Sequence, residues 1–319
     1  TFTADIFERK VTDILIPGGK DYPALIGDDD LPFENAGILK TTGFELQAKW
    51  SDKLANGFRY SVGVALSDDK AKVVSYPSNP TNKIGDGVLY KGYTVGDIWG
   101  YVTGGILQEG DFDGVGANGK PLYHGPYFKG GQAYPGYIWY QDLDHDGVIT
   151  TGLNTVDDPG DRKVIGNNAP RYRYNITANF QYKGFDLDLM FQGVGKRDYW
   201  LSSTSSYWGN GAGSWEVYNN SWTPERTDAK FPMYGSGTGS YPQTGYLLDA
   251  SYIKLKQVIL GYTFPRALIN KIGLEKLRLN LAAYNLFTIS DMPKYYDADY
   301  LSDAYPPKRT FSVGIQVGF

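Results

Sequence analysis

Apolar and polar residues alternate one by one in several long stretches of the chain. The most regular stretch is RYRYNITANFQY, residues 171–182, in which every second residue is apolar. Successive side chains of a β-strand point to opposite faces, so this pattern predicts a strand with one apolar and one polar face. The last ten residues, TFSVGIQVGF, follow the same alternation up to Phe319.

Eight such strands are predicted, and the connections between them differ in length. The strands cover about 1–14, 40–51, 56–68, 170–183, 184–197, 250–265, 276–288 and 309–319. The long connections are about 15–39, 69–169, 198–249 and 289–308, and the short ones about 52–55, 183–184 and 266–275. Long loops at one end and short turns at the other are typical of outer-membrane barrels. We therefore predict an all-β fold: about eight antiparallel transmembrane strands of a larger barrel, with long extracellular loops.

The stretch YIKLKQVILGYTF, residues 252–264, interrupts the alternation. Ile253 and Leu255 are apolar in one phase, whereas Val258 and Leu260 are apolar in the other. A one-residue shift moves every later side chain to the opposite face. Either a β-bulge near Gln257 restores the apolar face, or the first half of the strand lies outside the bilayer. The next connection contains RALINKIG, which predicts a helix of one or two turns.

The loop pattern also predicts an orientation. Short turns of bacterial barrels are periplasmic, and the connection before the last strand is long. Phe319 and Thr1 are therefore both expected at the periplasmic end. Because the chain begins directly in a strand, we expect it to be a piece of a longer precursor.

Composition excludes several classes of protein. The chain has no cysteine, two histidines and a formal net charge of -4. Disulfides and thiolate metal sites are excluded, and catalytic triads with histidine find little support. The charge does not favour nucleic-acid binding. No apolar run is long enough for a transmembrane helix. The 27 tyrosines, 15 phenylalanines and 7 tryptophans instead suit the aromatic girdles of a membrane barrel.

Several motifs follow one another in an order that is similar to a known family. They are NAGILKTTGFELQAKW, PGYIWYQDLDHDGVIT, DRKVIGNNAPRYRYNITANFQYKGFDLDLMFQG, NSWTPERTDAKFP, LDASYIKLKQVILGYTFP and LRLNLAAYNLFTISD. The chain resembles, over most of its length, the SusC/RagA-type TonB-dependent outer-membrane transporters of Bacteroidetes.

The resemblance implies that residues 1–319 are the carboxyl-terminal portion of a large barrel. Neither a plug domain nor a TonB box is visible in this sequence, so the plug and the amino-terminal strands are expected elsewhere. The first predicted strand should then not pair with the last one. The implied function is TonB-dependent import of oligosaccharides or peptides through the outer membrane. Its implied partners are the rest of the transporter, a SusD-like lipoprotein, TonB through the plug, and lipid. No enzymatic activity is expected.

The segment DLDHDG has the spacing of the first half of an EF-hand calcium loop. Asp142, Asp144 and Asp146 stand at positions 1, 3 and 5, and the carbonyl of Val148 stands at position 7. Position 12 is a leucine, so the match is incomplete. The resemblance implies Asp161 as the closing carboxylate, with Asp157 and Asp158 as competitors. The segment is therefore either a Ca²⁺ site or an acidic, solvated turn.

The long connections also carry aromatic residues that could contact a ligand. The candidates are Trp99, Tyr101, Tyr207, Trp208 and Trp215. They either pack the loops together or stack on sugar rings or peptides at the outer mouth. The alternative function is a secreted, soluble, calcium-bound β-domain that binds glycans. In that case a second sheet should cover the apolar face of residues 172–182.

Overall fold

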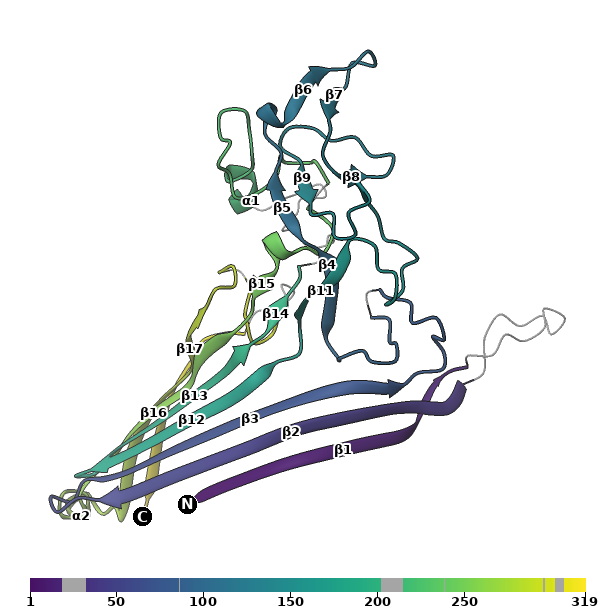
Figure 1. Cartoon of the computed structure of the whole chain (residues 1–319). Helices are drawn as coiled ribbons and strands as arrows, with labels where there is room; N and C mark the ends of the chain where they lie inside the picture. Colours follow the sequence, from purple (N-terminus) through teal and green to yellow (C-terminus); the bar gives the residue numbers. More distant parts are fainter. Residues whose placement is uncertain (19–32, 86, 202–214, 238, 295, 302–306) are drawn as a thin grey trace.

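A computed structural model describes the chain except for residues 19–32, 86, 202–214, 238, 295 and 302–306. Its main feature is one antiparallel sheet of eight strands (Figure 1). The strands are β1 (Phe2–Pro17), β2 (Phe33–Lys53), β3 (Arg59–Ser75), β12 (Arg171–Tyr182), β13 (Phe185–Lys196), β16 (Tyr252–Thr263), β17 (Lys276–Ser290) and β18 (Thr310–Gly318). They pair in chain order, which confirms the predicted all-β fold and all eight strands.

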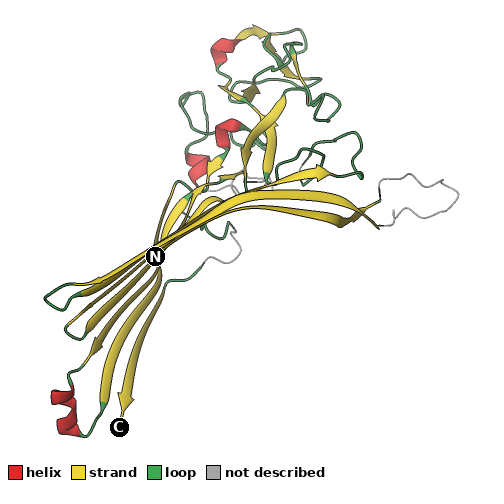
Figure 2. Ribbon diagram, turned by 60° about the horizontal axis from the view of Figure 1, so that its bottom comes forward, coloured by secondary structure: helices red, strands yellow, loops and turns green. Residues whose placement is uncertain are grey.

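The sheet is open, with β1 at one edge and β18 at the other. Within the part of the chain that the structure describes, these two strands do not pair with each other, as predicted. Both chain ends lie at the end of the sheet where the short turns are (Figure 1). Figure 2 shows the carboxyl end beside the short helix of the β16–β17 connection. The tightest of these turns is Lys183-Gly184, with φ angles of 48° and 87°. Two successive positive φ angles match a two-residue hairpin turn and favour glycine.

The predicted ends of two strands were wrong. β2 begins at Phe33 rather than near residue 40, and β3 continues to Ser75 rather than ending near residue 68. The two strands remain hydrogen-bonded in this region, for example at the pair Leu39–Val73. In residues 33–39 and 69–75 apolar and polar residues no longer alternate strictly, although the two strands still pair. Backbone hydrogen bonds do not depend on side-chain type, so nothing in the sequence indicated this extension.

The predicted bulge in β16 is confirmed, and Lys256 is the extra residue. Leu255 pairs with Phe191 and Gln257 with the preceding Met190, so the ladder skips Lys256. The pairing with β17 shifts at the same place. The bulge therefore returns the apolar residues to one face after the lysines.

One face of the sheet is apolar and exposed. Ile6 in β1 is 86% exposed, and Val313 in β18 is 72% exposed. The other sheets among the described residues are two-stranded and are formed largely by loop segments. Thus no second sheet covers this apolar face in the described chain, in contrast to the soluble alternative. Exposed apolar surface of this extent requires a partner that is itself apolar.

The described parts of the three long connections that follow β3, β13 and β17 are folded together above the sheet and contain short elements (Figure 1). They are β4 (Asp97–Tyr101), β5 (Thr103–Ile106), η2 (Glu109–Asp111), β6 (Phe112–Val115), β7 (Pro121–Tyr123), β8 (Tyr127–Phe128), β9 (Ile138–Tyr140), β10 (Val148–Ile149), β11 (Arg162–Asn167), β14 (Asp198–Tyr199), α1 (Trp215–Asn219), η3 (Thr244–Tyr246) and β15 (Leu248–Asp249). We call the described residues of 76–170 (first connection), 197–251 (second) and 291–309 (third) together the loop body.

The buried hydrophobic core lies largely in the loop body. One cluster includes Tyr140 from the first connection, Phe231 from the second and Tyr296 from the third. A smaller cluster surrounds Ile84 beside the end of β3. The three connections are thereby held as one unit by shared apolar contacts.

The short connection between β16 and β17 contains α2 (Arg266–Ile269) and η4 (Asn270–Ile272), which confirms the predicted short helix. Among the described residues, no helix is long and apolar enough to cross a membrane.

Candidate functional site

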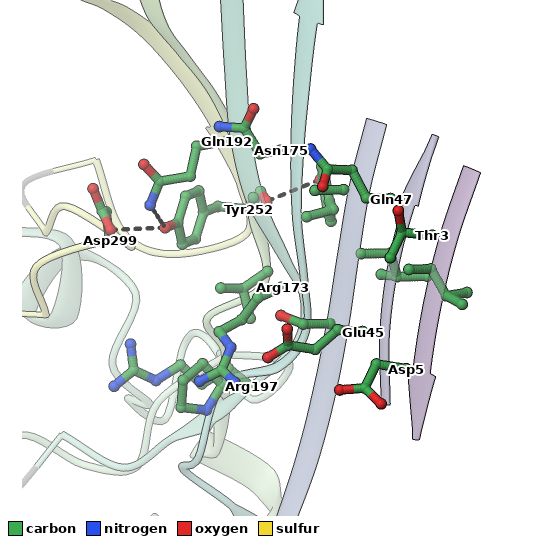
Figure 3. A pocket seen from close by; sticks show the side chains of 18 residues that line it. Thr3, Asp5, Glu45, Gln47, Arg173, Asn175, Gln192, Arg197, Tyr252 and Asp299 are labelled. Carbon is green, nitrogen blue, oxygen red and sulfur yellow. Dashed lines mark hydrogen bonds between the residues drawn. The ribbon is translucent and has the colours of Figure 1, made fainter. Parts of the chain in front are cut away.

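The polar face of the sheet forms a concave wall with a cavity of about 730 Å³ near the loop body (Figure 3). Strands β1, β2, β3, β12, β13 and β16 all contribute to its lining. The polar lining residues labelled in Figure 3 are Thr3, Asp5, Glu45, Gln47, Arg173, Asn175, Gln192, Arg197, Tyr252 and Asp299. A pocket of this size accommodates a small ligand.

Ion pairs between strands stabilise this polar wall, both across neighbouring strands (β3 and β12) and across β16 (β13 and β17). Arg171 pairs with Asp68, and Arg278 pairs with Asp186. Arg173, which lines the cavity, pairs with Asp69. Such pairs let charged residues occupy a wall without leaving their charges uncompensated.

The strongest polar cluster joins β16 to the last long connection. The Lys254 side chain is 1% exposed, and its Nζ donates to both carboxylate oxygens of Asp297 at 2.7 and 2.8 Å. Lys256 Nζ donates to Asp299 Oδ2 at 2.9 Å. We call these four residues the lysine–aspartate cluster. Because it connects strand and loop, it fixes the position of the third connection at the mouth of the sheet.

Hydrogen bonds extend this cluster into the cavity. Tyr252 Oη donates to Asp299 Oδ1 at 2.7 Å, and Gln192 Nε2 donates to Tyr252 Oη at 3.2 Å (Figure 3). The sequence alone did not predict the lysine–aspartate cluster. The available signal was the two lysines of YIKLKQ and the two aspartates of YDADY, but nothing in the sequence pairs segments that lie about 40 residues apart.

The acidic loop brings its three aspartates together as expected. One carboxylate oxygen from each of Asp142, Asp144 and Asp146 lies within 4.8 Å of the others. Asp142 accepts hydrogen bonds from the backbone N–H groups of His145, at 2.6 Å, and Gly147, at 2.8 Å. These bonds shape the turn that the DxDxDG spacing predicts.

Asp161 closes this loop, although it is not one of the three clustered carboxylates. It is 0% exposed, and its two carboxylate oxygens accept from Leu143 N at 2.8 Å and Thr150 N at 2.7 Å. The competing Asp157 is exposed, and Asp158 accepts from Leu153 N instead. Asp161 thus joins both ends of the acidic loop, and Val148 lies between them.

The carboxylates of the loop have opposite pKa shifts. Desolvation acts to raise the pKa of Asp142, but the N–H groups of Gly147, His145 and Asp146 outweigh it and lower the pKa. Desolvation raises the pKa of Asp144, and the charges of Asp161, Asp146 and Asp142 add to that effect. A bound cation would relieve this repulsion, so the residues fit a hard cation with oxygen ligands. Calcium binding stays a prediction.

Replacing Asp161 with alanine is expected to loosen the acidic loop. The substitution leaves the part-buried N–H groups of Leu143 and Thr150 without an acceptor, at a cost of about 1 kcal/mol each, the lower end of the range for buried groups. Hydrogen–deuterium exchange across residues 142–161 should therefore become faster. The matched control is Asp157→Ala, since Asp157 is exposed. Equal exchange in both variants would argue against the closing role of Asp161.

Calcium binding has a separate test on the full-length protein. If the clustered oxygens bind Ca²⁺, titration with Ca²⁺ should release or absorb heat. The double variant Asp144→Asn and Asp146→Asn should bind Ca²⁺ at least about tenfold more weakly, because two anionic ligands are lost. Chelation of Ca²⁺ should also speed hydrogen exchange at residues 142–148. No binding heat and no change in exchange would leave an acidic, solvated turn.

The candidate loop aromatics have different surroundings. Tyr101 is buried in the loop-body core, and Trp99 donates to Tyr90 Oη at 2.9 Å. Trp215 in α1 is 75% exposed and lies beside the ring of Tyr218 at 5.7 Å. Tyr207 and Trp208 lie outside the described residues. Of the described candidates, Trp215 therefore offers the most ring surface to a ligand.

The sequence is similar along nearly all of its length to curated TonB-dependent receptors. TonB-dependent receptor P3 of Formosa agariphila is 28% identical over 99% of this chain. TonB-dependent receptor SusC of Bacteroides thetaiotaomicron is 24% identical, also over 99%. The chain is a homologue of the TonB-dependent receptors. This confirms the family resemblance. No protein-family model matches the sequence.

This receptor homologue spans about a third of the length of the curated relatives that it matches, 32% of receptor P3 and 30% of SusC. Two solved structures have a similar fold, the RagAB peptide transporter and the RagAB peptide importer in the open-open state. Both cover 100% of this chain with a TM-score of 0.70, at 18% and 19% identity, and 33% of each matched chain is covered. This likeness confirms the predicted fold class, a segment of an antiparallel β-barrel.

Proposed function

We propose that this receptor homologue is the carboxyl-terminal part of the barrel of a TonB-dependent outer-membrane importer. The observation that carries the proposal is the open sheet with an exposed apolar face and a polar, ion-paired face. An apolar band against lipid and a polar interior are the two surfaces of a transmembrane β-barrel. Residues 1–319 would then form about a third of the assembled chain.

The free edges support the same proposal. β1, with 16 residues, and β18, with nine residues, each have one edge without a strand partner among the described residues. Open edges of this length are prone to pair with further strands, and barrels remove such edges by closure. The amino-terminal strands that the resemblance implies would close this barrel between β18 and β1, and the plug would fill its interior. The loop body would lie outside the cell, with Phe319 at the periplasmic end.

The substrates and partners that we propose are those that the family resemblance implies. The imported nutrients are oligosaccharides or peptides, bound at the outer mouth with a SusD-like lipoprotein. TonB would act through the plug, and the described residues would supply the wall and the loops. This division of roles assigns no bond-breaking step to the chain.

The proposed function is tested by uptake in the native host. Cells with the full-length protein should take up a labelled nutrient, and uptake should fall to background in cells that lack either this protein or TonB. Affinity purification of the protein should also recover a surface lipoprotein. Uptake that is unchanged without TonB would refute the proposed mechanism.

A further inference from the structure

Unlike Arg171, Arg173 and Arg278, Arg197 has no carboxylate partner for its terminal amino groups among the described residues. It follows β13, and its Nε donates to the carbonyl oxygen of Asn168 at 2.9 Å. No ion pair in the described part of the chain involves Arg197, whereas Arg171, Arg173 and Arg278 each have an aspartate. Its guanidinium therefore keeps two nitrogens available for a further partner.

Arg197 is half-buried and lines the cavity on the same side as Arg173, whereas the amides of Asn175 and Gln192 lie at the other side (Figure 3). Burial lowers its pKa, and the nearby Tyr252, Tyr199 and Asp299 only partly oppose that effect. A partly desolvated cation gains more from an anionic partner than an exposed one does. The planar guanidinium matches a carboxylate with two parallel hydrogen bonds.

The β1–β2 side of the same cavity carries the opposite charge. Asp5 of β1 and Glu45 of β2 are direct register partners, and both line the cavity (Figure 3). Like charges directly opposite each other on neighbouring strands are destabilising. Neither carboxylate forms an ion pair within the described chain, in contrast to Asp68, Asp69 and Asp186. A cationic group between Asp5 and Glu45 would offset this repulsion.

We propose that this cavity binds a dipolar ligand, an oligopeptide, with a carboxylate on Arg197 and an ammonium group on Asp5 and Glu45. The inference rests on the proposed function and narrows its substrate class. A neutral oligosaccharide carries neither charge and would offer these three groups no ionic partner. The cavity volume of about 730 Å³ suits a short peptide segment.

The test uses the full-length transporter, purified from outer membranes with its associated partners, and trialanine as the probe. Calorimetry should show that trialanine binds and that maltotriose binds more weakly. Amidation of the carboxyl end should weaken binding about tenfold or more, because a charge-assisted contact is lost. Acetylation of the amino end should weaken binding similarly.

Variants connect each peptide end to its residue. Arg197→Gln should weaken trialanine binding about tenfold or more but leave the amidated peptide nearly unaffected. Glu45→Gln should show the same pattern with the acetylated peptide. The matched control is Arg59→Gln, since Arg59 is an exposed arginine of β3 that lines a pocket at the other end of the sheet. If Arg197→Gln does not assemble, Arg197→Lys, which keeps the charge but loses the paired hydrogen bonds, takes its place.

The inference is overturned if trialanine does not bind, if blocking either end has no effect, or if the variants bind all peptides like the wild type. Uptake separates this failure from that of the proposed function. Normal, TonB-dependent uptake of trialanine by the Arg197→Gln variant would refute the peptide site alone. Loss of TonB dependence would refute the proposed function.

Discussion

Val313→Arg is expected to prevent most of the protein from assembling in the outer membrane. Val313 lies in the middle of β18, on the apolar face, and is 72% exposed. If this face contacts lipid, an arginine there costs about 2–4 kcal/mol near the middle of the bilayer. The measurement is the fraction of full-length protein that migrates as a folded barrel in unheated gels of outer-membrane extracts.

The adjacent residue provides the matched control. Ser312 pairs with Ala282 and points to the polar face, so Ser312→Arg places the same charge one residue away and toward the interior. We expect Ser312→Arg to assemble nearly as well as the wild type. Equal loss in both variants would show that the two faces are not distinguished by lipid, and the barrel proposal would fail.

Lys254→Met is expected to release the third long connection from the sheet. The substitution leaves Asp297 and Asp299 without their buried counter-charge. Breaking a buried ion pair costs about 3–5 kcal/mol, and we expect the lower end because these carboxylates are 17% and 24% exposed. The full-length protein should unfold at a lower temperature in detergent, and proteases should cut residues 291–309 faster.

Two further variants separate the lysine–aspartate cluster from a general loss of packing. Lys256→Met should cost less than about 1 kcal/mol, because Lys256 is 29% exposed and pairs with Asp299 alone. Lys254→Met combined with Asp297→Leu should recover stability, since an apolar pair often replaces a buried ion pair without loss. No recovery, with equal effects of both lysine variants, would contradict the role of the cluster.

The cluster also has a predicted pH dependence. Burial acts to raise the pKa of Asp299, but hydrogen bonds from Lys256 and Tyr252 and the charge of Lys254 outweigh it and hold the pKa below its ordinary value of 3.8. A lowered pKa in the folded state stabilises the fold at pH above the ordinary value. This contribution is lost as the pH falls below 3.8, so protease cutting of residues 291–309 should rise only there.

The strands were predictable from the sequence because alternation records which face contacts which environment. Even the Lys256 bulge was visible, since it is the point where the apolar phase changes. The upper ends of β2 and β3 were not visible, because their extension is held by backbone hydrogen bonds. Those bonds place few demands on side chains.

The candidate site was less predictable for a related reason. The acidic loop is local, so its spacing was enough to place Asp142, Asp144 and Asp146 together. The lysine–aspartate cluster and the position of Arg197 depend on which distant segments meet at the sheet. A single sequence gives no signal for such contacts between distant segments.

The shared core of the loop body has a consequence for the exchange of loops between relatives. Tyr140, Phe231 and Tyr296 come from three different connections but belong to one buried cluster. If one connection were replaced by that of a relative, its side chains would have to pack against the two unchanged connections. They would not match the buried cluster that these two connections form. Changes of ligand preference at this mouth should therefore be inherited, or engineered, as whole sets of three connections.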